Sequence, residues 1–125
     1  MTLSGGRYDV QTIRHLMNQR KGVVYYLRIS NRRDALVKIG YSEHLLHRLS
    51  AHRRTWPTCT LLAVEDGSLN KEYFRHSEFD DHRVREGTER ELFRQNPRLA
   101  ALIFEIKTGR KVSEDSALLK LWGFA

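Results

Sequence analysis

Cysteine and proline are scarce in this sequence of 125 residues, which has one Cys and two Pro, and long apolar runs are absent. The single cysteine, Cys59, cannot form an internal disulfide or supply a cysteine-rich zinc site of the usual spacing. No segment approaches the roughly 20 apolar residues of a membrane-spanning helix. The first residues also lack the basic and apolar stretches of a secretion signal. We therefore expect a cytoplasmic protein with no membrane partner.

Acidic side chains are outnumbered by basic ones. The chain has 15 Asp and Glu against 22 Lys and Arg, a formal net charge of +7. Most of the cations are arginine, whose planar guanidinium matches the geometry of phosphate. This charge favours an anionic partner, although a solvated basic surface has the same composition. A chain of this length fits one domain, so we expect a single domain over residues 1–125.

The order of predicted elements indicates an α+β fold. Segments rich in β-branched and aromatic residues predict strands over 23–29, 35–40 and 60–65. Apolar residues at helical spacing, with capping residues and glycines at the ends, predict helices over 8–20, 43–54, 69–85, 89–93 and 97–106. The type of the last apolar segment, 118–122, stays open. We predict a three-stranded antiparallel sheet flanked by helices.

The predicted helix over 69–85 brings polar side chains together. At about 100° per residue, one edge of it carries Glu72, His76, Phe79 and Arg83. A carboxylate, an imidazole and a guanidinium then share one rim. Taken alone, an acidic residue near a helix start is also a favourable partner of the helix dipole.

Two short strings on the first two predicted strands lie close in sequence. The first strand includes Val24-Tyr25, and the second runs into Lys38-Ile39-Gly40-Tyr41-Ser42. Arg48 and His52 follow on the next predicted helix, about one turn apart. This order resembles the two motifs and the following arginine of the GIY-YIG nuclease superfamily.

The later residues resemble one phage-associated branch of that superfamily, in which the second motif reads Lys-Ile-Gly-Tyr-Ser or Lys-Ile-Gly-Tyr-Thr. That branch ends with a glutamate, a histidine, a phenylalanine, a glycine and a Glu-x-Phe-like close. The corresponding residues here are Glu72, His76, Phe79, Gly87 and Glu91-Leu92-Phe93. The resemblance spans residues 22–93 as a GIY-YIG-like core, with an N-terminal helix before it and a C-terminal helical extension after it. It implies a gene of bacterial or phage origin.

Two positions depart from the usual motifs. Gly22 stands three residues before Tyr25, whereas the family has its glycine two residues before the tyrosine, and this leaves Tyr26 as an alternative. Lys38 stands where the second motif usually has a tyrosine. Lysine there looks like a recognised variant, which removes a hydroxyl and supplies a cation.

The resemblance implies a metal-dependent endonuclease that hydrolyses phosphodiester bonds, with DNA as the expected nucleic acid. It implies that Glu72 holds one divalent ion, Mg²⁺ or Mn²⁺. Such hard cations prefer oxygen ligands and can bind through one carboxylate with waters and substrate phosphate.

The same resemblance implies that Tyr25 is the general base toward the attacking water. An ordinary tyrosine loses its proton only near pH ~10, so nearby cations must favour the phenolate. Lys38 and Arg48 are the available cations, and Arg48 is expected to stabilise the transition-state charge. We expect His52 to position water or contact the leaving group and His76 to orient Glu72.

Nucleic-acid contacts are predicted at basic and aromatic positions: Lys38, Tyr41, Arg53, Arg54, Arg32 and Arg33. A catalytically silent GIY-YIG-fold module that only binds nucleic acid remains an alternative. So does a protein-interaction domain, for instance an inhibitor or adaptor. A nuclease needs Glu72 to face Tyr25 and Arg48, which separates these alternatives. The oligomeric state stays open, since the sequence allows a homo-oligomer but does not indicate one.

Overall fold

The computed structural model describes residues 11, 14–15, 22–30, 36–87 and 91–117. In this part of the chain, a four-stranded antiparallel sheet has the strand order β3-β1-β2-β4. The strands are β1 (Val23–Arg28), β2 (Val37–Ser42), β3 (Thr60–Asp66) and β4 (Leu92–Phe93). The helices are α2 (Leu45–Thr55), α3 (Leu69–Glu78) and α4 (Pro97–Thr108), with a 3₁₀ turn, η1 (Asp80–His82). The predicted α+β fold with an antiparallel sheet and flanking helices is confirmed.

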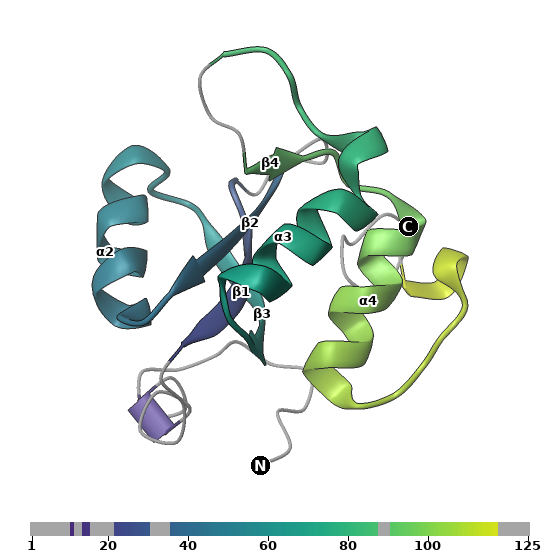
Figure 1. The fold of residues 1–125 in the computed structure, drawn as a ribbon, viewed down its shortest axis with the longest axis horizontal. Helices are drawn as coiled ribbons and strands as arrows, with labels where there is room; N and C mark the ends of the chain where they lie inside the picture. Colours follow the sequence, from purple (N-terminus) through teal and green to yellow (C-terminus); the bar gives the residue numbers. More distant parts are fainter. Residues whose placement is uncertain (1–10, 12–13, 16–21, 31–35, 88–90, 118–125) are drawn as a thin grey trace.

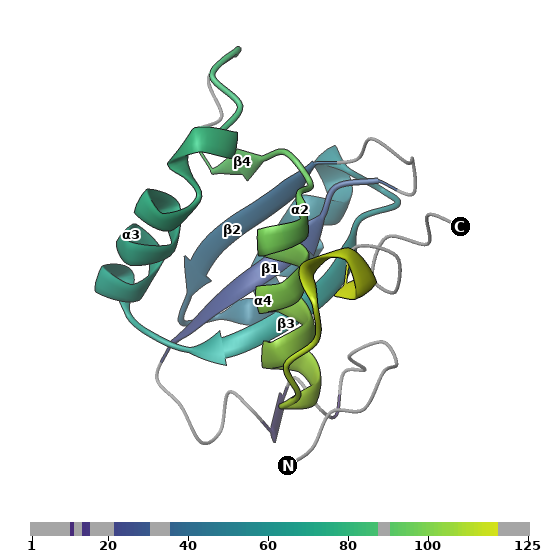
Figure 2. The same ribbon diagram turned by 90° about the vertical axis from the view of Figure 1, so that its right-hand side faces the viewer.

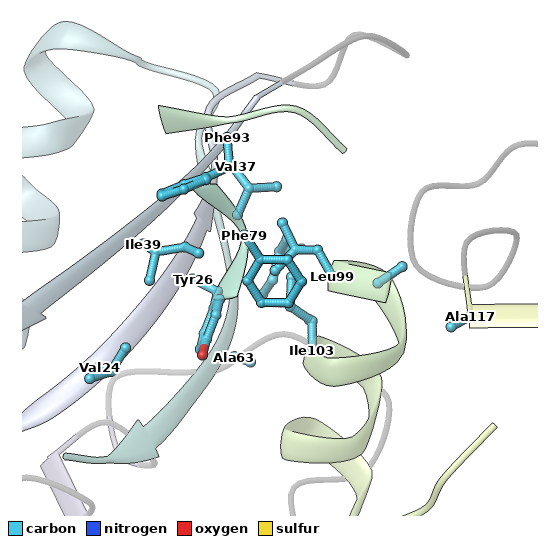
Figure 3. Close-up of a cluster of buried hydrophobic side chains, with 12 residues drawn as sticks. Val24, Tyr26, Val37, Ile39, Ala63, Phe79, Phe93, Leu99, Ile103 and Ala117 are labelled. Carbon is cyan, nitrogen blue, oxygen red and sulfur yellow. The ribbon is translucent and has the colours of Figure 1, made fainter. Parts of the chain in front are cut away.

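Helices cover both faces of the sheet. In Figures 1 and 2, α2 and α4 lie on opposite faces, and α3 lies along the edge beyond β2. The central strand β1 therefore has a core on each side. Tyr25 belongs to the cluster that α2 covers with Leu45 and Leu49. Tyr26 belongs to the cluster under α4, as Figure 3 shows.

The helix α4 confirms the prediction over 97–106 and has well-formed ends. The Asn96 side chain accepts a hydrogen bond from the backbone N–H of Leu99 at 2.9 Å, and Pro97 occupies the first turn. Gly109 follows the helix in the left-handed conformation, with φ 76°. These caps stabilise both ends of α4, the helix that packs on one face of the sheet.

The strand β4 replaces a predicted helix. The sequence predicts a helix over 89–93, and this prediction is wrong for its described residues, because Leu92 and Phe93 pair with Lys38 and Val37 on β2. Phe93 is fully buried in the core under α4. Two apolar residues are too few for a helical stripe, and they complete the open edge of β2 instead. The sheet therefore has four strands in the described residues rather than the predicted three.

The helix α3 ends at Glu78, whereas the sequence predicts an end near Arg85. The Asp80 carboxylate accepts hydrogen bonds from the side chains of Arg83 and Arg85, each at 2.9 Å. These contacts form a turn after the helix. Arg83 therefore does not lie on the edge of the predicted helix over 69–85. Gly87, expected to end the helix, adopts φ 81° in a later bend.

Three predicted features lie outside the described residues. They are most of the helix over 8–20, the hairpin residues Arg32 and Arg33, and the apolar segment over 118–122. The helix predicted over 43–54 is α2, which begins two residues later. The sequence suggests Ser42 as the cap of this helix, but the N-cap residue is His44, which makes no side-chain cap hydrogen bond. The Ser42 hydroxyl accepts a hydrogen bond from the backbone N–H of His44 at 2.9 Å.

Candidate functional site

Tyr25 lies on the central strand and points toward α2. It pairs with Gly40 across β1 and β2. A Cβ atom at position 40 would lie 2.5 Å from the Tyr25 hydroxyl oxygen, so only glycine leaves room for this ring. The hydroxyl lies 2.8 Å from Nε2 of His52 on α2. This contact holds the hydroxyl group of Tyr25 against α2.

Tyr26, the alternative tyrosine, points toward the opposite face of the sheet. Its hydroxyl donates a hydrogen bond to the Glu65 carboxylate. Burial raises the pKa of Tyr26, and the negative charge of Glu65 raises this pKa further. A phenol in this setting stays protonated and is a poor base. Adjacent residues of a strand point to opposite faces, so the sheet gives the two tyrosines different environments.

Lys38 lies on the Tyr25 face of β2, two residues before Gly40. Its side chain is only 5% exposed, and its Nζ lies 2.6 Å from a carboxylate oxygen of Glu91. A buried ammonium group is costly unless a partner compensates its charge. Glu91 supplies that partner. The sequence shows Glu91 within a motif but assigns it no role, because its proximity to Lys38 depends on the pairing of β4 with β2.

Glu72 and His76 lie one turn apart on α3 and both bind the edge of β2. β4 pairs only with Val37–Lys38, so α3 covers the edge beyond that point. Nε2 of His76 lies 2.8 Å from the Ile39 carbonyl oxygen, and this nitrogen must donate because a carbonyl oxygen only accepts. The backbone N–H of Tyr41 donates a hydrogen bond to Glu72. These two contacts fix α3 beside β2.

Glu72 is 9% exposed as a residue, and its carboxyl group lies among charges of both signs. Burial raises the pKa of Glu72, and the negative charge of Glu91 adds to this effect. The Tyr41 N–H and the positive charges of Lys38 and Arg48 act in the opposite direction but do not cancel it. Lys38 and Arg48 therefore both lie close enough to Glu72 to act on its charge. The structure brings them together beside the face that carries Tyr25.

His76 has the environment of a positioning residue. Its ring packs against Phe93 with a centroid distance of 5.2 Å. Burial lowers the pKa of His76, an effect that the hydrogen bond to Ile39 opposes. The hydrogen bond from His76 to the Ile39 carbonyl oxygen holds α3 beside β2.

The other predicted contact residues are more dispersed. Arg53 and Arg54 are exposed in the last turn of α2. The side chain of Tyr41 leaves β2 on the face opposite Tyr25, and its ring lies over Gly22. The contact of Tyr41 with Glu72 is the hydrogen bond from its backbone N–H.

The donors around Glu72 fit a hard divalent ion. No group of three or more His, Cys, Asp or Glu side chains that could hold a metal ion occurs in the described residues. Mg²⁺ usually keeps waters and binds through one or two carboxylates and substrate phosphate. Glu72, with the Glu91 charge nearby, suits Mg²⁺ or Mn²⁺.

The described residues form a small α+β domain with an antiparallel sheet and helices. A family model described as the T5orf172 domain matches residues 22–107. The chain therefore belongs to the T5orf172 domain family, a phage-associated family related to GIY-YIG and HNH-like nuclease folds. No curated protein and no solved structure matches it. None of the helices in the described residues is long and apolar enough to cross a membrane.

Proposed function

We propose that this chain is a metal-dependent GIY-YIG-type endonuclease that hydrolyses phosphodiester bonds, with DNA as the expected substrate. Its main support is that the positive charges of Lys38 and Arg48 both act on Glu72, and that Lys38 and Tyr25 share one face of the sheet. Phosphodiester hydrolysis needs a base for the attacking water, positive charge for the phosphoryl oxygens and help for the leaving oxygen. These residues supply the first two requirements directly.

Tyr25 would take the proton from the attacking water. With Nε2 of His52 unprotonated, the Tyr25 hydroxyl donates to it across 2.8 Å, and His52 can accept the phenolic proton. The phenolate left on Tyr25 would then take the proton of the attacking water. Tyr26 would take no part, since its hydroxyl is bound to Glu65 on the other face.

Lys38 and Arg48 would bind the phosphoryl oxygens. Lys38 is nearly buried and is paired with Glu91, so phosphate would compete with that carboxylate for its Nζ. Arg48 is exposed on α2 and can contact the phosphate with two guanidinium nitrogens at once. Both charges would offset the negative charge that grows on the phosphoryl group.

Glu72 would hold one Mg²⁺ or Mn²⁺ ion. Such an ion, when bound, supplies Lewis-acid stabilisation of the phosphoryl and leaving oxygens. The Tyr41 N–H would hold the carboxylate in one orientation, and His76 would hold α3 against β2. Exposed Arg53 and Arg54 on α2 would contact the backbone of the nucleic acid farther along.

The test is a cleavage assay on plasmid and oligonucleotide substrates with Mg²⁺, Mn²⁺ or EDTA, comparing the wild type with Glu72→Gln. We expect Glu72→Gln to abolish metal-dependent cleavage. Its binding to nucleic acid should remain or become slightly tighter, because a negative charge near phosphate is removed. Glu78→Gln is the matched control, since Glu78 lies on the same helix and pairs with Arg75, and it should cut normally.

Other outcomes would favour other functions. Full cleavage by re-purified Glu72→Gln contradicts the proposal. If the wild type and Glu72→Gln both bind and neither cuts with any metal, the chain is a silent nucleic-acid-binding module. If the wild type binds no nucleic acid at low salt, a protein-interaction domain becomes the better account.

A further inference from the structure

Three large apolar side chains are exposed on α3. The exposed fractions are 55% for Leu69, 68% for Tyr73 and 60% for Phe74. Two of them are aromatic, and all three lie within three positions of Glu72. Large apolar side chains gathered on a surface often mark a binding site, so their direction relative to Glu72 matters.

The contacts of α3 show which of its sides faces α4. The Arg75 side chain donates to the Glu65 carboxylate at 3.1 and 3.0 Å. Glu65 also binds Tyr26, which lies in the core under α4. Phe79, just after the helix, lies in the same core (Figure 3). The side of α3 that carries Arg75 therefore faces the α4 side of the sheet.

Helical geometry then places the exposed side chains. Glu72 and His76 face the edge of β2, and Arg75 lies about 60° to one side of Glu72. Leu69 lies about 60° to the other side of Glu72, and Tyr73 about 40° beyond Leu69. Leu69 and Tyr73 thus border the side of α3 that faces the Tyr25 face of the sheet.

Phe74 has a different direction from Tyr73. It lies about 180° from the midline between Glu72 and His76, so it points away from the sheet. The guanidinium of Arg75 lies 5.5 Å from the centre of its ring. Two aromatic side chains of similar exposure thus differ in whether they border the candidate site.

We propose that Tyr73, supported by Leu69, is a stacking platform for an unpaired nucleobase next to the phosphate that the site would cleave. This inference rests on the proposed function and specifies its substrate as nucleic acid with unpaired bases at the cleavage point. Aromatic side chains stack on every base because each base has a π-face. In a duplex both faces of a base are covered by its neighbours, so an exposed platform favours single strands or extruded bases.

Charge favours a nucleic acid as the occupant. The chain has a formal net charge of +7. The exposed side chains of Arg48, Arg53 and Arg54 belong to α2, which covers the sheet face that Tyr73 borders. A polyanion whose backbone follows these cations would bring its bases toward α3. This pairing of a basic track and an aromatic platform is typical of single-strand binding.

The experiment measures binding in EDTA, so that cleavage does not interfere. The probes are a single-stranded oligonucleotide with one 2-aminopurine and the same oligonucleotide in a duplex. Wild type should prefer the single strand and quench 2-aminopurine by stacking. Tyr73→Ala should bind the single strand ~5- to 100-fold more weakly and lose the quenching. Tyr73→Phe should restore both, because it keeps the ring.

Phe74→Ala is the matched control, because Phe74 is similarly exposed but points away from the site. It should bind like the wild type. Equal affinity of Tyr73→Ala and wild type overturns the platform, as does an equal loss in Phe74→Ala. A surface for a protein partner would also leave oligonucleotide affinity unchanged in Tyr73→Ala. If the wild type binds no nucleic acid, both the platform and the proposed function fail. If the wild type cleaves normally and Tyr73→Ala binds the single strand as tightly as the wild type, only the platform is overturned.

Discussion

The Tyr25 hydroxyl lies 2.8 Å from Nε2 of His52, and this contact joins the central strand to α2. The Tyr25 side chain is 1% exposed, so the strand and the helix hold both partners. The His52 ring also packs near the Trp56 ring, with 5.6 Å between the two ring centroids. A tyrosine held so closely can act as a base without large movement, and its chemistry can be tested apart from its packing.

Tyr25→Phe removes the hydroxyl and keeps the ring. We expect cleavage to slow by ~10²–10⁴-fold, because the general base is lost. Stability should fall by only about 1 kcal/mol, the usual contribution of one hydrogen bond. Single-turnover cleavage and urea unfolding measure the two effects. Tyr26→Phe should keep its cleavage rate per folded molecule, and an equal loss of rate there would contradict the assignment of Tyr25.

Gly40→Ala should displace Tyr25. The new Cβ would lie 2.5 Å from the Tyr25 hydroxyl oxygen, so the ring must move away from His52. Gly22→Ala is the matched control, because its Cβ would lie 2.4 Å from the Tyr41 hydroxyl oxygen on the other face. Both variants should be destabilised by roughly 1–3 kcal/mol. At a temperature where both are folded, only Gly40→Ala should lose cleavage, and equal rates would argue against the role of Tyr25.

His76 should make folding sensitive to acid. Burial lowers the pKa of His76 below its ordinary value of 6.5, so the unfolded chain takes up this proton first as the pH falls. The stability that His76 contributes is therefore present above about pH 6.5 and is lost as the pH falls through its folded-state pKa. Urea unfolding at pH 7.5 and pH 5 should show a smaller loss of stability in His76→Gln than in the wild type. His47→Gln, an exposed histidine on α2, should behave like the wild type.

Glu91→Gln should strengthen nucleic-acid binding. The change removes the negative charge of Glu91, whose carboxylate oxygen lies 2.6 Å from Nζ of Lys38. The same charge also raises the pKa of Glu72. Affinity for an oligonucleotide in EDTA should rise by about 5-fold, which corresponds to ~1 kcal/mol of removed repulsion. Glu86→Gln changes a more exposed carboxylate 3.8 Å from Arg94 and should leave affinity unchanged. Weaker binding by Glu91→Gln would mean that the carboxylate positions Lys38 for phosphate instead of competing with it.

Local patterns in the sequence are sufficient for most of the fold. The apolar runs of β1, β2 and β3 and the capped helix α4 follow from side-chain types over consecutive residues. Two features differ most clearly from the prediction, strand β4 and the C-terminal end of α3, and both depend on contacts that a local pattern does not show. β4 forms because Phe93 completes a core and an open edge, and α3 stops where Asp80 binds Arg83 and Arg85.

The sequence by itself determined which chemical groups the candidate site contains, because the order of Tyr25, Lys38, Arg48 and Glu72 is a property of the chain. Alternation along a strand also required Tyr25 and Tyr26 to face opposite sides. Only the tertiary structure decided which of them meets His52 and which is bound to Glu65. The physical reason is that the pattern of residue types reports the periodicity within one helix or strand. The partner of a side chain depends instead on how helices and strands pack against one another. The pairing of Lys38 with Glu91 and the exposure of Tyr73 beside Glu72 likewise arise only when β4 and α3 dock against β2.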